Sequence, residues 1–196
     1  MSSQPGADST RDRVVTAATA EFSQYGIAGA RIDRIARAAR TSKERVYAYF
    51  SSKEALYRFV SAQALAAVAE ATRMDPTDLP GYAGRVHDYF AAHPERFRLM
   101  TWGRLELSDS GTPAYDPVQQ TVAHKVEQLR KAQEAGHLDP AWDPLDILVF
   151  VNQLAVSWAD QPDLTGTLPA HERADHLATR RAAIVTAVQR LFPAAA

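Results

Sequence analysis

Apolar side chains recur every three or four positions along most of this chain of 196 residues. Near the start, Val14, Ala18 and Phe22 follow one another at intervals of four, as residues on one face of an α-helix do. No segment sustains the alternation of apolar and polar residues that predicts a half-buried β-strand. The spacing therefore predicts an all-α fold, in which each helix buries one stripe of its surface.

Proline-bearing breaks, the first at residues 75–81, divide the chain into segments of helical length. We expect a disordered arm over residues 1–9, a head of small helices over residues 10–56 and a larger helical body over residues 57–193. Nine helices are expected in all. They lie at about residues 10–25 and 32–39, from about 42, and at about residues 51–73, 82–93, 94–107, 117–135, 144–160 and 169–192.

Capping side chains mark several of the expected helix ends. Ser9 followed by Asp12 predicts a reciprocal N-terminal cap, and Gly26 predicts a left-handed end for the same helix. Further along, Thr41 and Ser51 each stand three positions before a glutamate. We therefore expect two adjacent helices to open with the same reciprocal cap.

The two parts of the chain differ in charge. Residues 1–60 carry ten Lys and Arg against six Asp and Glu, whereas residues 61–196 carry twelve against seventeen. A basic head on an acidic body is typical of a nucleic-acid-binding protein with a separate regulatory part. The chain holds no cysteine, which excludes disulfides, thiolate metal sites and a cysteine nucleophile.

The apolar segments predict a soluble protein of the cytoplasm. Residues 1–8 lack the basic-then-apolar pattern of a signal peptide. The longest apolar stretch, Ile147–Trp158, is interrupted by Asn152 and Gln153 and is too short to span a bilayer.

The helix that opens at Ser42 combines anchoring residues with residues that suit a DNA groove. Val46 and Phe50, four apart, can anchor it to the two preceding helices and complete a helix-turn-helix unit. Beside these anchors stand a hydroxyl, two cations and two tyrosines, which suit a groove lined by phosphates. Each is also an ordinary surface or packing residue, but their combination on one short helix favours DNA. The candidate DNA-binding residues are Arg31, Ser42, Lys43, Arg45, Tyr47, Tyr49 and Lys53.

This part of the chain resembles the amino-terminal domain of the tetracycline-repressor (TetR) family. The resemblance implies an all-helical homodimer that binds a palindromic operator in double-stranded DNA and releases it when a small molecule enters the carboxy-terminal body. It covers about residues 10–60, and its matching positions are Phe22, Gly26, Ile35-Ala36, Ser42, residues 46–50 and residues 52–56.

The resemblance also implies roles for single residues. Tyr47, Tyr49 and Lys53 stand where the family usually grips phosphate. Residues 43–45, which are Lys, Glu and Arg, stand where base-reading residues vary.

Two positions depart from the family pattern, and both add positive charge. Arg31 replaces a threonine that often caps the second helix and binds phosphate, so the helix loses a cap worth about 1 kcal/mol, while the guanidinium can contact phosphate instead. Arg40 replaces a glycine that commonly makes the turn. Because left-handed backbone costs a non-glycine residue about 1–2 kcal/mol, we expect this turn to differ and the next helix to be slightly re-aimed.

Aromatic residues concentrate between Tyr82 and Leu107, the expected centre of the body. An apolar cavity with a few polar groups is the usual form of a small-molecule site. Aromatic stripes also fill helical cores, so that alternative stays open, as does the choice between Asn152 and Gln153 as a polar group facing the pocket. The candidate ligand-binding residues are Tyr89, His93, Phe97, Met100, Trp102 and Asn152.

The helix expected at residues 144–160 is apolar around most of its circumference, which predicts burial on more than one side. The last helix carries an apolar stripe of near-heptad spacing from Leu177 to Leu191. By resemblance, these two helices pair with their copies in a partner subunit as a four-helix bundle. The candidate dimer-interface residues are Phe150, Leu154, Trp158, Ile184 and Val188.

Signatures of a metal site or of catalysis are weak, and no cofactor is expected. His171 and His176 lie five residues apart, about 140° round a helix, so they cannot share one metal ion as residues four apart do. We interpret the chain as a ligand-responsive repressor. Two alternatives remain: a small-molecule carrier or enzyme with a vestigial head, and an architectural DNA-binding protein without a pocket.

Overall fold

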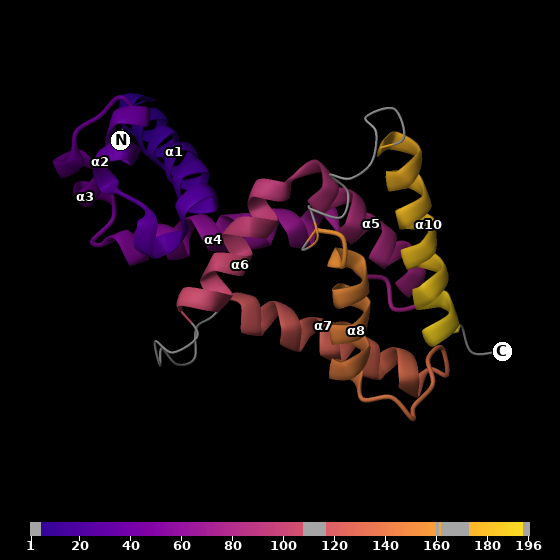
Figure 1. Ribbon diagram of the computed structural model, residues 1–196. Helices are drawn as coiled ribbons and strands as arrows, with labels where there is room; N and C mark the ends of the chain where they lie inside the picture. Colours follow the sequence, from indigo (N-terminus) through magenta and orange to yellow (C-terminus); the bar gives the residue numbers. More distant parts are fainter. Residues whose placement is uncertain (1–4, 108–116, 160, 162–172, 194–196) are drawn as a thin grey trace. The chain divides into compact units, whose positions relative to one another are not determined.

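The computed structural model describes residues 5–107, 117–159, 161 and 173–193. Within these ranges every regular element is an α-helix, which confirms the predicted all-α class (Figure 1). The helices lie within a few residues of the expected positions. They are α1 (Pro5–Gly29), α2 (Ile32–Ala38), α3 (Lys43–Tyr49), α4 (Lys53–Ala71), α5 (Leu79–Ala92), α6 (Pro94–Glu106), α7 (Pro117–Glu134), α8 (Pro144–Val156) and α10 (Arg173–Leu191).

The chain divides into two compact units, and the division differs from the expected boundary at residue 57. The first unit combines residues 1–66 with residues 94–114, and the second combines residues 67–93 with residues 115–196. The difference arises because α6 packs against α1. Leu99 of α6 is fully buried in the same core as the apolar stripe of α1.

Both ends of α1 differ in part from the prediction. The helix begins at Pro5, so residues 5–9 belong to it rather than to a disordered arm, and the cap predicted at Ser9 is wrong. Gly26 adopts the left-handed backbone expected of it, with a φ of 69°. One more helical turn follows the resulting kink and ends at Gly29.

The core of the first unit forms around α1. Val14, Ala18 and Phe22 are fully buried, as their spacing predicted. The ring of Phe22 meets the ring of Tyr57 edge-on at a centroid distance of 5.3 Å. This is a favoured arrangement of two aromatic rings, and it ties α4 to α1.

Tyr57 also fixes α6. Its hydroxyl donates a hydrogen bond to the main-chain carbonyl of Leu99 at 2.6 Å, and burial raises the pKa of the phenol. A Cβ at Gly103 would collide with the same hydroxyl. The register of α6 on this core is therefore set by a buried hydrogen bond and by a residue without a side chain.

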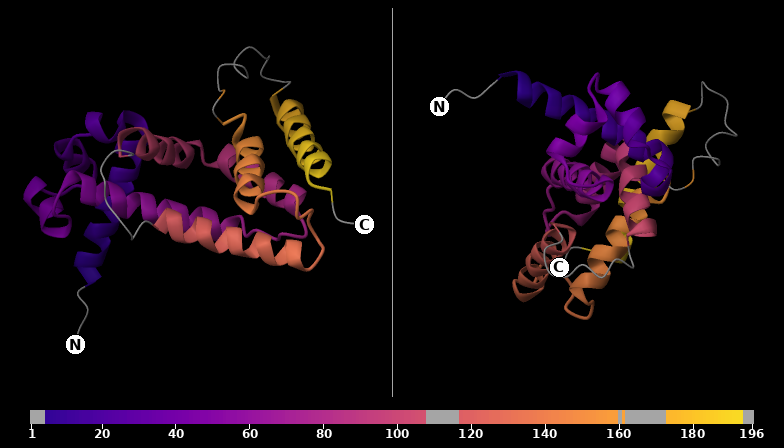
Figure 2. Two further views of the ribbon diagram at one scale, coloured as in Figure 1. Left: turned by 90° about the horizontal axis from the view of Figure 1, so that it is seen from below. Right: turned by 90° about the vertical axis from the view of Figure 1, so that its left-hand side faces the viewer.

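In the second unit, α5 packs against both α8 and α10, and α7 crosses α8 (Figures 1 and 2). Tyr82, Ile147 and Val188 are fully buried there. On the surface, Nε of Arg181 lies 2.8 Å from a carboxylate oxygen of Asp88 and links α10 to α5. None of the helices in the described ranges is long and apolar enough to cross a membrane.

Candidate nucleic-acid interface

A capped start and a buried stripe define α3. The Ser42 hydroxyl accepts a hydrogen bond from the backbone N–H of Arg45 at 3.2 Å. Val46 and Phe50 are buried in the first unit, as predicted. Hydrogen bonds from its own backbone N–H and from the Ser42 hydroxyl lower the pKa of the Glu44 carboxyl.

Ser42, where the third helix was expected to open, is the N-cap of α3, although the spacing to Glu44 favoured Thr41 as its cap. The cap of α4 lies one residue later than predicted, because the Ser52 rather than the Ser51 hydroxyl accepts the backbone N–H of Ala55 at 3.0 Å. Where two hydroxyl residues adjoin, sequence spacing does not settle which one is the cap.

The turn between α2 and α3 keeps the left-handed form despite its arginine. Arg40 has a φ of 53°. The N–H of Arg40 donates to the carbonyl of Arg37 at 3.1 Å, and that of Thr41 donates to the carbonyl of Ala36 at 3.0 Å, the two hydrogen bonds of a Schellman motif. The expectation that this turn would change is therefore wrong. Nε of Arg13 adds a hydrogen bond to the carbonyl of Ala39 at 3.0 Å.

The outer face of α3 presents the cations and tyrosines expected of a recognition helix. Lys43, Arg45 and Tyr47 are exposed and Tyr49 is half-buried. Lys43 Nζ lies 3.4 Å from a carboxylate oxygen of Asp33. The Arg45 guanidinium lies 5.2 Å from the centre of the Tyr49 ring. These contacts hold the side chains over the helix surface, where an approaching duplex can reach them.

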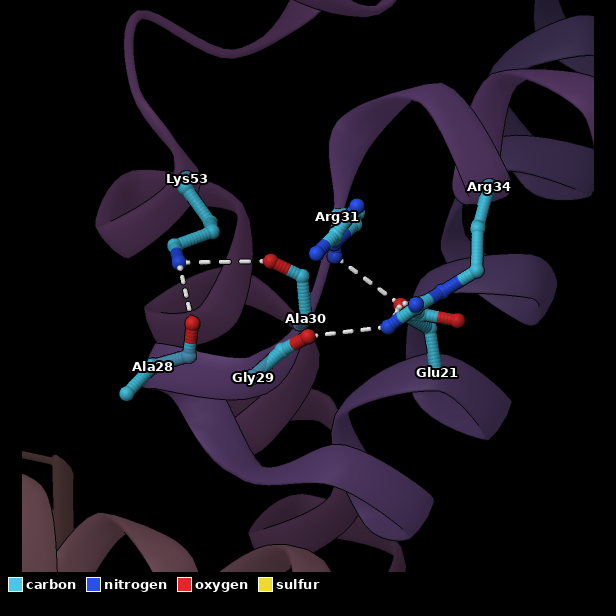
Figure 3. A network of polar contacts seen from close by, with 7 residues as sticks. All are labelled: Glu21, Ala28, Gly29, Ala30, Arg31, Arg34 and Lys53. Atoms are coloured by element: carbon cyan, nitrogen blue, oxygen red, sulfur yellow. Dashed lines mark hydrogen bonds and ion pairs between the residues drawn. The ribbon is translucent and has the colours of Figure 1, made fainter.

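Lys53 joins the start of α4 to the junction of α1 and α2 (Figure 3). Its Nζ donates to the main-chain carbonyls of Ala28 and Ala30, each at 3.3 Å. The ammonium therefore compensates the exposed carbonyls at the end of α1. From the α6 side, the Glu106 carboxylate accepts the N–H of Ala28 at 2.7 Å.

Arg31 begins α2 without a side-chain cap, as expected from the missing threonine. Its own backbone N–H donates to Oε1 of Glu21 at 2.9 Å, and its side chain is exposed. Sequence reasoning missed Glu21 and its partner Arg34, whose Nε donates to the same oxygen at 2.6 Å and whose Nη2 donates to the carbonyl of Gly29 at 2.8 Å (Figure 3). Thirteen residues separate the two side chains, so no helical spacing links them.

The candidate ligand-binding residues fall into both units. The rings of Tyr89 and His93, in the second unit, lie 4.8 Å apart between centroids, and Asn152 belongs to the same unit. The other three, Phe97, Met100 and Trp102, belong to the first unit.

One of these three contacts α1. Trp102 lies so close to Gly26 that a Cβ at that glycine would come 3.0 Å from the indole. Phe97 is buried. The Trp102 side chain of α6 therefore packs against α1.

The candidate dimer-interface residues also separate into two groups. Ile184 and Val188 are buried within their own chain, because α10 turns this stripe toward α5 and α8; their assignment to the interface is wrong. Phe150 is 42% exposed. Leu154 and Trp158 are half-buried, and the Arg180 guanidinium lies 3.5 Å from the centre of the Trp158 ring.

Two sequence predictions reach outside the described part of the chain. His171 is not among the described residues, and the side chain of Leu177 is not described. In the ranges that are described, no group of three or more His, Asp or Glu side chains could hold a metal ion.

The geometry of α1 to α4 defines a helix-turn-helix DNA-binding head: a short capped helix carries cations and tyrosines outward and is braced by two preceding helices. Family comparison agrees with it. The model "Bacterial regulatory proteins, tetR family" matches residues 14–60, and the model "Tetracyclin repressor-like, C-terminal domain" matches residues 78–190. The chain belongs to the TetR family of DNA-binding transcriptional regulators.

Individual relatives are similar over half of the chain or more. The HTH-type transcriptional repressor SCO4008 of Streptomyces coelicolor is 39% identical over 152 residues, which cover 78% of this chain and 79% of the relative. The HTH-type transcriptional repressor NicS of Pseudomonas putida is 37% identical over 107 residues, which cover 50% of each chain. The crystal structure of SCO4942, a candidate transcriptional regulator from Streptomyces coelicolor, is 54% identical with a TM-score of 0.84 and covers 94% of this chain and 98% of that chain.

Proposed function

We propose that this protein is a ligand-responsive repressor that binds a palindromic operator as a homodimer, in the cytoplasm where the chromosome lies. The observation that carries the proposal is the outer face of α3, where Lys43, Arg45 and Tyr47 are exposed on a helix anchored by the buried Val46. Two relatives are named repressors, which supports repression as the output.

The residues of the head divide by what they contact on DNA. Lys43 and Arg45 lie on the face of α3 that enters the major groove, so they read base edges. Tyr47, Tyr49 and Lys53 bind phosphates on either side, and the exposed guanidinium of Arg31 adds a phosphate contact from the start of α2. Phosphate contacts fix the position of the helix, whereas base contacts choose the sequence.

The dimer forms through α8 and the end of α10. Large apolar side chains stay exposed there in the single chain, namely Leu145, Val149, Phe150 and Leu191. An exposed apolar patch of this kind marks an interface. A two-fold axis through it presents two copies of α3 to two half-sites of a palindrome.

A small molecule releases the dimer from DNA by binding its body. It binds more tightly to a conformation in which the two heads no longer match the operator. Such an effector shifts the population of dimers only by its difference in affinity for the two conformations. The body is the second unit, and the carboxy-terminal family model, which matches residues 78–190, covers most of that unit together with α6 of the first unit.

Selection of bound duplexes from a random DNA pool tests the proposal. The full-length protein should enrich a palindromic sequence. The Arg45→Ala variant, which keeps Lys43 and should stay folded, should prefer different bases. Screening metabolites against the selected duplex then tests release. Recovery of no preferred sequence would contradict the repressor and would favour a carrier or enzyme with a vestigial head, which turnover of a bound small molecule would reveal. A preferred sequence that no metabolite releases would favour an architectural DNA-binding protein.

A further inference from the structure

Three polar side chains from three helices form a chain of hydrogen bonds inside the second unit. Nζ of Lys125 in α7 donates to the hydroxyl of Tyr82 in α5 at 2.7 Å. That hydroxyl donates to Oδ1 of Asn152 in α8 at 3.1 Å, and the Asn152 amide donates to the carbonyl of Leu148 at 2.8 Å. The hydrogen bonds of this Lys–Tyr–Asn chain all run from the lysine toward the asparagine, so Lys125 is the first donor.

The ammonium of Lys125 has no counterion among the residues that the structure describes. Its contacts there are the hydrogen bond to Tyr82 and the approach of its charge to the Tyr82 ring. An ammonium carries three N–H donors, and the described residues supply an acceptor for one of them. Lys125 is half-buried and Tyr82 is 1% exposed. A cation withdrawn from water favours a negatively charged partner.

Several neighbouring positions on the three helices are apolar and buried, whereas Thr121 and Gln128 on either side of Lys125 are polar. Leu129, one turn beyond Lys125, is fully buried. Val86 lies one turn beyond Tyr82, and Val151 directly precedes Asn152; both are buried. One cation among aliphatic residues is complementary to a molecule that has an apolar body and one anionic group, because charge-assisted hydrogen bonds are the stronger ones.

We propose that Lys125, positioned by Tyr82 and Asn152, binds the anionic group of an otherwise apolar effector. The group is a carboxylate, sulfonate or phosphate, all of which offer charged oxygen acceptors. The proposal rests on the proposed function, since it assigns a ligand class to the body of the regulator. It also changes the part assigned to Asn152, which acts on the lysine through the Tyr82 hydroxyl rather than by touching the ligand.

Two fluorescent probes with the same aromatic framework separate the effect of charge from that of shape. 8-Anilinonaphthalene-1-sulfonate carries an anionic group, and N-phenyl-1-naphthylamine lacks it. In the full-length protein, Lys125→Met should weaken binding of the sulfonate by about tenfold or more and leave the neutral probe unchanged. Tyr82→Phe keeps the ammonium but removes the hydroxyl that positions it. Binding of the sulfonate should therefore weaken by a smaller factor. The matched control is Lys131→Met, which removes a 70% exposed lysine from the same helix and should change neither probe.

Three results would overturn the proposal. The first is equal sulfonate affinity in the wild type and in Lys125→Met, with circular dichroism showing both folded. The second, usable if the methionine variant does not fold, is equal sulfonate affinity in Lys125→Gln. The third is a wild type that prefers the neutral probe.

The DNA selection is independent of the probes. A protein that selects an operator but has no charge preference refutes the anion site alone. A protein that prefers the charged probe but selects no operator refutes the repressor function and leaves the anion site standing.

Discussion

The carboxylate of Glu21 in α1 lies 2.6 Å from the guanidinium of Arg34 in α2. The same oxygen accepts the backbone N–H of Arg31, the N-cap residue of α2. In a capping box, a glutamate in the first turn of the same helix accepts the backbone N–H of the N-cap residue. Here a neighbouring helix supplies the carboxylate, so the orientation of α2 on α1 is fixed by the contact that also holds its first turn.

Replacing Glu21 should therefore destabilise the head. Glu21→Ala leaves the partly buried N–H of Arg31 without an acceptor, and we expect the free energy of unfolding to fall by about 1–2 kcal/mol. Urea denaturation measures it. Glu70→Ala is the control, because Glu70 pairs with Arg73 where both side chains are more than 70% exposed, and it should leave the midpoint unchanged. Equal effects of the two variants would contradict the role of Glu21.

The left-handed arginine in the turn should be a site of stabilisation. Arg40→Gly removes the Cβ from a backbone with a φ of 53°, and we expect the free energy of unfolding to rise by about 0.5–1 kcal/mol. Arg37→Gly, in the right-handed last turn of α2, should lower it by about 1 kcal/mol. Opposite signs in the two urea titrations are the expected result. A loss of stability in both variants would show that the turn is not strained.

The buried phenol of Tyr57 predicts a pH dependence at the alkaline side. Burial raises the pKa of Tyr57 above its ordinary value of 10.0, so the folded state favours the neutral phenol. The resulting stability is fully present below about pH 10 and is lost as the pH rises through the raised pKa. Tyr57→Phe should lack this component, so its stability should fall less steeply across alkaline pH in urea titrations. Tyr25→Phe, at an exposed tyrosine, controls for the loss of one hydroxyl.

Lys53 should contribute to DNA affinity without choosing a sequence. Lys53→Met removes one phosphate contact, so binding to the selected operator and to unrelated duplexes should weaken by the same factor. The slope of log affinity against log salt concentration should become shallower by about 0.9. Fluorescence anisotropy at several salt concentrations measures both, with Lys131→Met as the control. An unchanged slope would show that Lys53 remains on the carbonyls of Ala28 and Ala30 in the complex.

The exposed side chain of Phe150 should hold the dimer together. Phe150→Glu places a charge in the proposed interface, where it cannot stay hydrated, and should shift the protein to a monomer in sedimentation experiments. Operator affinity should fall with it, because one head contacts one half-site. An intact Phe150→Glu dimer would place the interface elsewhere.

Local patterns predicted most of the fold. The helices of the described ranges and the anchors Val46 and Phe50 follow from apolar spacing, because each helix buries one stripe wherever its partner lies. Apolar spacing does not show which residues that are far apart in the sequence lie in contact. Neither the bond between Glu21 and Arg34 nor the placement of α6 on α1 has a periodic signal.

The dimer stripe shows the same limit. Ile184 and Val188 have the spacing of a helix–helix seam, but this spacing does not say whether the partner helix belongs to the same chain. The structure turns them toward α5 and α8, whereas Phe150 on α8 stays exposed. Pocket residues are harder still to predict from sequence, because a tryptophan such as Trp102 can line a ligand site or, as here, pack against Gly26.

The packing of α6 on α1 limits how this regulator can be taken apart. A fragment that stopped at residue 60 would leave the Tyr57 hydroxyl without its acceptor on Leu99 and would open the face of Gly26 that Trp102 covers. Recombination that joins this head to the body of another regulator would have to carry α6 along, so the portable piece is discontinuous in the gene.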